Sequence, residues 1–123
     1  MNAFLWALQV LLGVTFVAAG LMHAGLPRQR LLERLPWVEN FSEPTVKFIG
    51  TMELAGGLGV VPPALTGIAP ILTPIAATGL AVIMLGAIVT HIRRREPAGV
   101  AVTGVLFVLA AVVAWGRFGA YSF

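Results

Sequence analysis

"FIGTMELAGGLGVV", residues 48–61, is an apolar, glycine-rich stretch with a single carboxylate, Glu53, in its middle. Stretches of this kind are typical of membrane-spanning helices, in which an ionised side chain facing lipid costs about 2.5 to 3.5 kcal/mol. Such a side chain is normally turned into a helix bundle or a water-filled cavity, beside a polar partner. We therefore expect Glu53 to face inward and to have a partner.

The whole chain shares this apolar character. Of its 123 residues, 59% are hydrophobic and 11% are charged, and the mean hydropathy is +0.94. These values lie outside the usual range of soluble domains and predict an integral membrane protein. After its loops, a chain of this length has room for four spans of about 20 residues each and for no separate globular domain.

Four apolar runs, separated by prolines and charged residues, give the expected membrane spans. Their approximate bounds are residues 3–26, 44–61, 69–92 and 98–115. The first run is longer than a signal-peptide core and follows no basic residue, so we expect a retained helix. Ser42 is placed to cap the second helix, and Pro70 and Pro74 fall in the first turns of the third. The predicted fold class is all-α: one domain, residues 1–123, forming a four-helix transmembrane bundle.

The first loop, residues 27–45, holds six of the thirteen charged residues. Its segment "PRQRLLERL" places leucines on one side of a short helix and arginines on the other, a pattern typical of a helix in the membrane interface. The bulky rings of Trp37 and Phe41 fit the same depth. We expect a short interfacial helix here, and a further basic run after the third span to bind anionic lipid. The predicted interfacial anchors are Arg28, Arg30, Arg34, Trp37, Arg93, Arg94 and Arg95.

Basic residues are unevenly divided between the two sides that four spans would create. Seven of the eight lysines and arginines, all except Arg117, fall in or beside the first and third loops. Short loops rich in these residues stay in the cytoplasm, which predicts cytoplasmic first and third loops and both termini outside. Arg117, beside Trp115, is expected to mark the outer interface.

Three ionisable residues of different spans, His23, Glu53 and His91, are expected to converge. Glu53 lies nine residues past Pro44, roughly 13 Å along its helix, and both histidines lie near span ends on the same side. One interpretation is that hydrogen bonds among them hold the helices together. The other is a protonatable cluster that binds a polar headgroup, such as that of a quinone, because imidazole titrates near neutral pH.

Small residues follow Glu53 on the same helix. Ala55 and Gly59 form a small-xxx-small step, and Gly56 and Gly57 thin the helix further. Residues of this size let the backbones of two membrane helices approach closely. We therefore predict that these four positions pack against a neighbouring helix.

Several kinds of site are excluded or disfavoured. The chain has no cysteine, which excludes disulfides, thiolate metal sites and iron–sulfur ligation by its own residues. A two-histidine, one-carboxylate metal site would lack a local ligand motif, so we assign no metal and no catalytic residue. The basic residues are spread among apolar spans, which is not the basic, aromatic-interleaved surface that binds nucleic acid. The expected partner is the lipid bilayer.

Three stretches resemble the DoxX-like family of small four-helix bacterial membrane proteins. They are "FVAAGLMHAGLPRQRL" (16–31), "FIGTMELAGGLGVVPPALTGIAPILTPIAATGLAVIMLGAIVTHIRRRE" (48–96) and "AWGRFGAYSF" (114–123). The resemblance implies a multi-pass protein of the bacterial cytoplasmic membrane, and Glu53, Gly56, Gly57 and His91 fit the family pattern. It also implies a link to redox chemistry, since relatives are associated with a thiosulfate:quinone oxidoreductase subunit in some archaea and with a superoxide dismutase-containing membrane complex in mycobacteria.

Three functions remain open, and with them the question of enzymatic activity. The first is a quinone- or redox-linked accessory subunit, in which the cluster binds a headgroup and passes protons while a redox protein partner supplies electrons. The second is a non-enzymatic scaffold or assembly factor, in which the same residues only join helices. The third is a small transporter that works as a homo-oligomer, because four spans enclose little volume.

The predicted orientation can be tested with cysteines placed at Gly67 and Ser122, because the chain has none of its own. Both positions fall on the side opposite the basic loops, so a membrane-impermeant maleimide should label both from outside intact cells. If either cysteine reacts only after the cells are permeabilised, the orientation is wrong.

Overall fold

The computed structural model describes residues 2–119, apart from the side chain of Arg28, so the aromatic tail at 121–123 lies outside it. The regular structure of the described residues is entirely helical, which confirms the all-α fold class. The elements are α1 (Asn2–Gly25), α2 (Arg28–Arg34), a 3-10 helix η1 (Pro36–Asn40), α3 (Glu43–Gly59), α4 (Pro62–Thr66), α5 (Leu72–Arg93) and α6 (Pro97–Phe118).

Four helical stretches within residues 2–119 are long and apolar enough to cross a membrane. They are Asn2–Gly25, Glu43–Thr66, Leu72–Arg93 and Pro97–Phe118. Together with the short helix α2 in the first loop, they confirm a multi-pass membrane protein with four spans. Ser42 caps α3 as expected, since its side chain accepts a hydrogen bond from the backbone N–H of Thr45.

The segment after α3 differs from the expected plain loop. Pro62 and Pro63 begin a short helix, α4, because the first turn of a helix needs no amide hydrogen from them. Gly67 ends it with a left-handed φ of 72°. The third span then begins at Leu72 rather than near residue 69, after a turn in which Ala69 has a φ of 48°.

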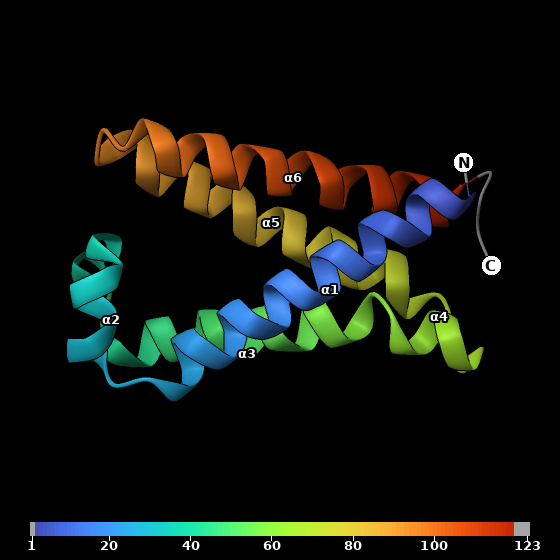
Figure 1. Ribbon diagram of the computed structural model, residues 1–123, viewed down its shortest axis with the longest axis horizontal. Helices are drawn as coiled ribbons and strands as arrows, with labels where there is room; N and C mark the ends of the chain where they lie inside the picture. Colours follow the sequence, from blue (N-terminus) through green and yellow to red (C-terminus); the bar gives the residue numbers. More distant parts are fainter. Residues whose placement is uncertain (1, 120–123) are drawn as a thin grey trace.

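The four long helices form two pairs. α1 packs mainly against α3, and α5 packs mainly against α6, while contacts of α3 with α5 and of α1 with α6 join the pairs. The two pairs lie close together near α4 and diverge toward α2 (Figure 1). The main hydrophobic core lies between the pairs and includes Leu12, Phe16, Leu80, Met84 and Val113.

α1 and α3 approach each other closely enough for backbone to meet backbone. A Cβ atom added at Gly20 of α1 would lie 2.5 Å from the backbone nitrogen of Leu54, and one at Gly50 of α3 would lie 2.5 Å from that of Ala24. Glycine is needed at both positions because a backbone neighbour cannot move aside as a flexible side chain can.

The residues after Glu53 contribute to this packing unequally. Gly57 lies against Val17 of α1, Gly56 against Leu80 of α5, and Gly59 against Ala76 of α5. Ala55 is exposed, because it lies on the side of α3 that turns away from both neighbours. The close contact therefore follows Gly50 and Gly57 rather than the expected Ala55–Gly59 step.

Arg117, expected beside Trp115 at the outer interface, is turned into the bundle, and only 2% of the residue is exposed. Its Nε donates a hydrogen bond to Oε1 of Gln9 (2.7 Å) and its Nη1 donates to Oδ1 of Asn2 (2.6 Å). Gln9 in turn donates to the carbonyl of Val60 at the end of α3 (2.7 Å). The buried guanidinium therefore ties α6 to α1 and, through Gln9, to α3.

Replacing Gly20 by alanine should destabilise the bundle, because the added Cβ would collide with the backbone of α3. Overpacking of this kind usually costs about 1 to 3 kcal/mol. The control is Gly104→Ala in α6, where nothing lies within 4 Å and alanine is the better helix former. Unfolding in mild detergent, followed by circular dichroism, should show a loss for Gly20→Ala only; equal stability of the two variants would contradict the close approach of α1 and α3.

Candidate functional site

A cavity of about 440 Å³ lies between the two helix pairs, on the side toward α2 where they diverge. Residues of α1, η1, α3, α5 and α6 line it, together with Leu35 and Phe41 on either side of η1, and most of the lining side chains are apolar or aromatic. Its ionisable lining residues are His23, Glu53 and His91, the three that the sequence singled out. The cavity therefore gathers all three, although they are not all in mutual contact.

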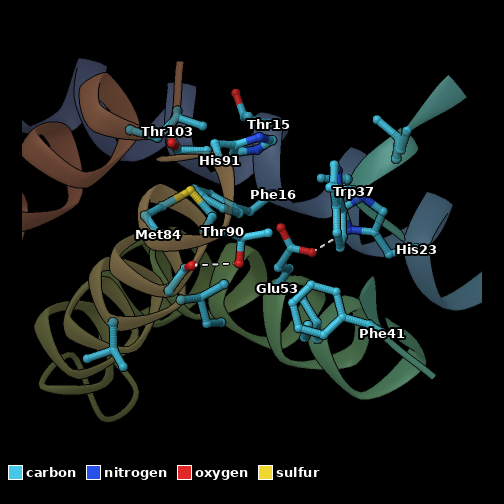
Figure 2. Close-up of a pocket in the computed structure, with 18 residues that line it drawn as sticks. Thr15, Phe16, His23, Trp37, Phe41, Glu53, Met84, Thr90, His91 and Thr103 are labelled. Carbon is cyan, nitrogen blue, oxygen red and sulfur yellow. Dashed lines mark hydrogen bonds and ion pairs between the residues drawn. The ribbon is translucent and has the colours of Figure 1, made fainter. Parts of the chain in front are cut away.

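Glu53 and His23 form a buried pair on one wall of the cavity. Glu53 is 3% exposed and His23 is 8% exposed. Oε1 of Glu53 lies 2.5 Å from Nδ1 of His23, so the carboxylate accepts a hydrogen bond from the imidazole when Glu53 is ionised. One carboxylate oxygen turns toward His23, while the other points into the cavity (Figure 2). Glu53 thus faces inward, as expected, with an oxygen available to a ligand.

His91 lies on the cavity wall contributed by α5 but is paired with a different carboxylate. Its Nδ1 lies 2.9 Å from Oε1 of Glu96, which precedes α6. The imidazole rests against Gly99, where an added Cβ would collide with the ring. The expected three-residue cluster is therefore two histidine–carboxylate pairs, one on α1 and α3 and one joining α5 to the start of α6.

The aromatic side chains of the first loop form another wall of the cavity. The Trp37 ring meets the His23 ring edge-on, with centroids 5.3 Å apart and an interplanar angle of 89°. Phe41 packs edge-on against Trp37 at 5.8 Å. Both rings also pack against a small second core that contains Leu31 and Val38. Trp37, predicted as an interfacial anchor, is thus half-buried over His23.

Arg94 joins the first loop to the α5–α6 connection. Its Nη1 donates hydrogen bonds to Oε1 of Glu39 (2.7 Å) and Oδ1 of Asn40 (2.8 Å), and its Nε lies 3.2 Å from Oε1 of Glu96. The loop that supplies Trp37 is thereby tied to the opposite helix pair. The other predicted arginine anchors with described side chains are all exposed at this end: Arg30, Arg34, Arg93 and Arg95.

The electrostatics outside the spans favour an ionised Glu96. Its hydrogen bond with His91, and then the nearby Arg94 guanidinium, hold the pKa of the Glu96 carboxyl below its usual range, although desolvation opposes them. Because this pKa is lower in the folded than in the unfolded chain, the contacts of Glu96 contribute stability at neutral pH. That contribution is lost as the pH falls through the lowered pKa.

Sequence reasoning missed several of these residues. Glu96 could have been found, since it is the one acid in the third loop and precedes Pro97 at the start of a helix. The roles of Glu39 and Asn40 depend on a contact with Arg94 more than 50 positions away, which leaves no local pattern. Within residues 2–119, no group of three or more histidine, cysteine or acidic side chains is placed to hold a metal ion.

Removing the Arg94 side-chain contacts should loosen the first loop. In Arg94→Gln the bonds to Glu39 and Asn40 are lost or weakened, so backbone amides of η1 should exchange with deuterium faster than in the unmodified protein. Arg93→Gln is the matched control, because Arg93 is the exposed neighbour of the same charge. Equal exchange in both variants, measured by mass spectrometry in detergent micelles, would show that Arg94 does not hold the loop.

Comparison with known proteins agrees with this architecture. No curated protein and no solved structure matches the chain. A model of the DoxX-like family matches residues 7–113, which is most of the chain. The match includes the second and third spans, most of the first and fourth, the loop that carries Trp37, and both histidine–carboxylate pairs. The chain is therefore a member of the DoxX-like family.

Proposed function

We propose that this membrane protein is a redox-linked accessory subunit whose cavity binds the headgroup of a membrane-soluble quinone or quinol. The observation that carries the proposal is the buried His23–Glu53 pair on the wall of an otherwise largely apolar cavity. A structural pair needs no such space beside it. A ligand with a flat apolar ring and polar oxygens needs both the space and the pair.

The size and lining of the cavity support this class of ligand. Its volume of about 440 Å³ is within the range of small-molecule sites, which is about 300 to 1,000 Å³. The rings of Phe16, Trp37 and Phe41 offer flat apolar surfaces for a quinone ring. Glu53 and His23 would hold a headgroup oxygen and accept or deliver the proton that accompanies its redox change. Electrons would come from a redox protein partner.

The scaffold alternative assigns the same pair only to joining α1 and α3. Those two helices also meet backbone to backbone at Gly20 and Gly50, so the contact between them does not rest on the pair alone. The basic loops at the cavity end support entry of the ligand from the cytoplasmic leaflet of a bacterial membrane, in the orientation predicted from charge.

Trp37 provides a built-in reporter of ligand binding, because it lines the cavity while Trp6 and Trp115 do not. In a Trp6→Phe, Trp115→Phe background, a short-tailed benzoquinone or naphthoquinone should quench Trp37 fluorescence with saturation. Glu53→Gln keeps the shape of the side chain but removes its charge, and should weaken binding about tenfold or more, because a hydrogen bond to a charged group contributes about 1.5 to 3 kcal/mol.

Glu43→Gln is the matched control, since Glu43 is an exposed carboxylate on the same helix and outside the cavity. It should bind the quinone as the parent does. Quenching that rises without saturation and is the same in all three proteins would reflect partition into detergent. That result would refute the quinone proposal.

A further inference from the structure

A second cavity adjoins the first at the end of the bundle that carries the basic loops. We call the first the inner cavity and the second the outer cavity. Its volume is about 480 Å³, and its lining runs from Arg34 and the first loop to Glu96 and the start of α6. The two cavities are separated by side chains that line both of them. These shared residues are Leu35, Trp37, His91 and Thr103.

His91 is the only shared residue whose side chain has ring nitrogens that can both accept and donate a proton. Leu35 and Trp37 offer no proton acceptor to either cavity. The Thr103 hydroxyl is committed to its own helix, since it donates a hydrogen bond to the carbonyl of Gly99 at 2.7 Å. Among the described residues, His91 is therefore the one titratable side chain that faces the inner and the outer cavity alike.

The His91 ring is fixed in this position by its surroundings. Glu96 Oε1 lies 2.9 Å from Nδ1, and the ring fits against α6 only because residue 99 is glycine. The charged groups around this pair are Arg94, whose Nε is 3.2 Å from Glu96 Oε1, and Arg34 on the wall of the outer cavity. Glu96 is thus the carboxylate that orients the ring.

The inner pair needs a route for protons. His23 and Glu53 are 8% and 3% exposed and lie within membrane-spanning helices. The hydrocarbon core holds no water that could carry a proton to them. The residues that line both the inner and the outer cavity offer such a route toward the aqueous face.

We propose that His91 is the proton port between the buried His23–Glu53 pair and the aqueous face, with Glu96 as its positioning residue; this rests on the proposed proton exchange with a quinone. An N–H bond forms at the ring nitrogen that receives the proton, and the N–H bond at the other ring nitrogen breaks as that nitrogen releases its proton. Water in the inner cavity carries the proton onward to Glu53. No electron moves in this step, and the net change is one proton passed from one cavity to the other.

The chain has only two histidines, so its imidazole N–H groups can be followed one by one after labelling with ¹⁵N-histidine. The measurement is the rate at which the His23 ring N–H exchanges with solvent in detergent micelles. His91→Phe keeps a ring in place but cannot pass a proton, and should slow this exchange by about 100-fold, the low end of what a positioned proton-transfer group contributes. Glu96→Gln should slow it less, because the imidazole remains but is no longer oriented by a carboxylate.

Glu43→Gln is again the control and should leave the rate unchanged. If His23 exchanges at the parental rate, or faster, in both His91→Phe and Glu96→Gln, water reaches the inner pair by another path and the port is refuted. If His91→Phe does not fold, Glu96→Gln alone carries the test. The quinone titration of Trp37 tests the proposed function separately. Slowed His23 exchange without saturable quenching would support the proton port and refute quinone binding. Saturable quenching without slowed exchange would support quinone binding and refute the port.

Discussion

The cost of leaving a charged side chain among lipid tails governs how this bundle is assembled. Glu53 and Arg117, at 3% and 2% exposure, are both turned inward, and both find their hydrogen-bond partners on α1. α1 therefore binds α3 through His23 at one end and α6 through Gln9 at the other. Gly20 and Gly50 let the backbones of α1 and α3 approach closely beside this bond.

The two ends of the bundle differ in how the space between the helix pairs is filled. Near α4 the pairs converge, and side chains such as Leu12, Leu80 and Val113 form a continuous core. Toward α2 the pairs diverge, and the space is a cavity bounded by the rings of the first loop and tied across by Arg94. Cavities between the helices of a bundle are common ligand sites, and here the paired ionisable side chains lie on their walls.

Different observations support the family membership of this protein and its proposed function. The DoxX-like match covers residues 7–113 and establishes the family, and the four apolar helices establish a multi-pass membrane protein. A fold can support many activities, so the quinone proposal depends on the site itself. That site consists of Glu53 with one carboxylate oxygen pointing into the cavity, the imidazole of His23 beside it, and a cavity lined by aromatic rings (Figure 2). The second pair, His91 and Glu96, extends that site toward the outer cavity.

The sequence by itself determined the helical class, the four spans, the helix in the first loop and the inward direction of Glu53, because these follow from hydropathy and from the cost of burying charge. Only the tertiary structure decided which partner each polar group has. Glu53 pairs with His23 rather than His91, Arg117 binds Gln9 inside the bundle, and Arg94 binds Glu39 of the first loop. The physical reason is that hydrogen bonds need atoms about 3 Å apart. Whether residues far apart in the chain come that close depends on helix rotation and crossing, which local sequence patterns do not encode.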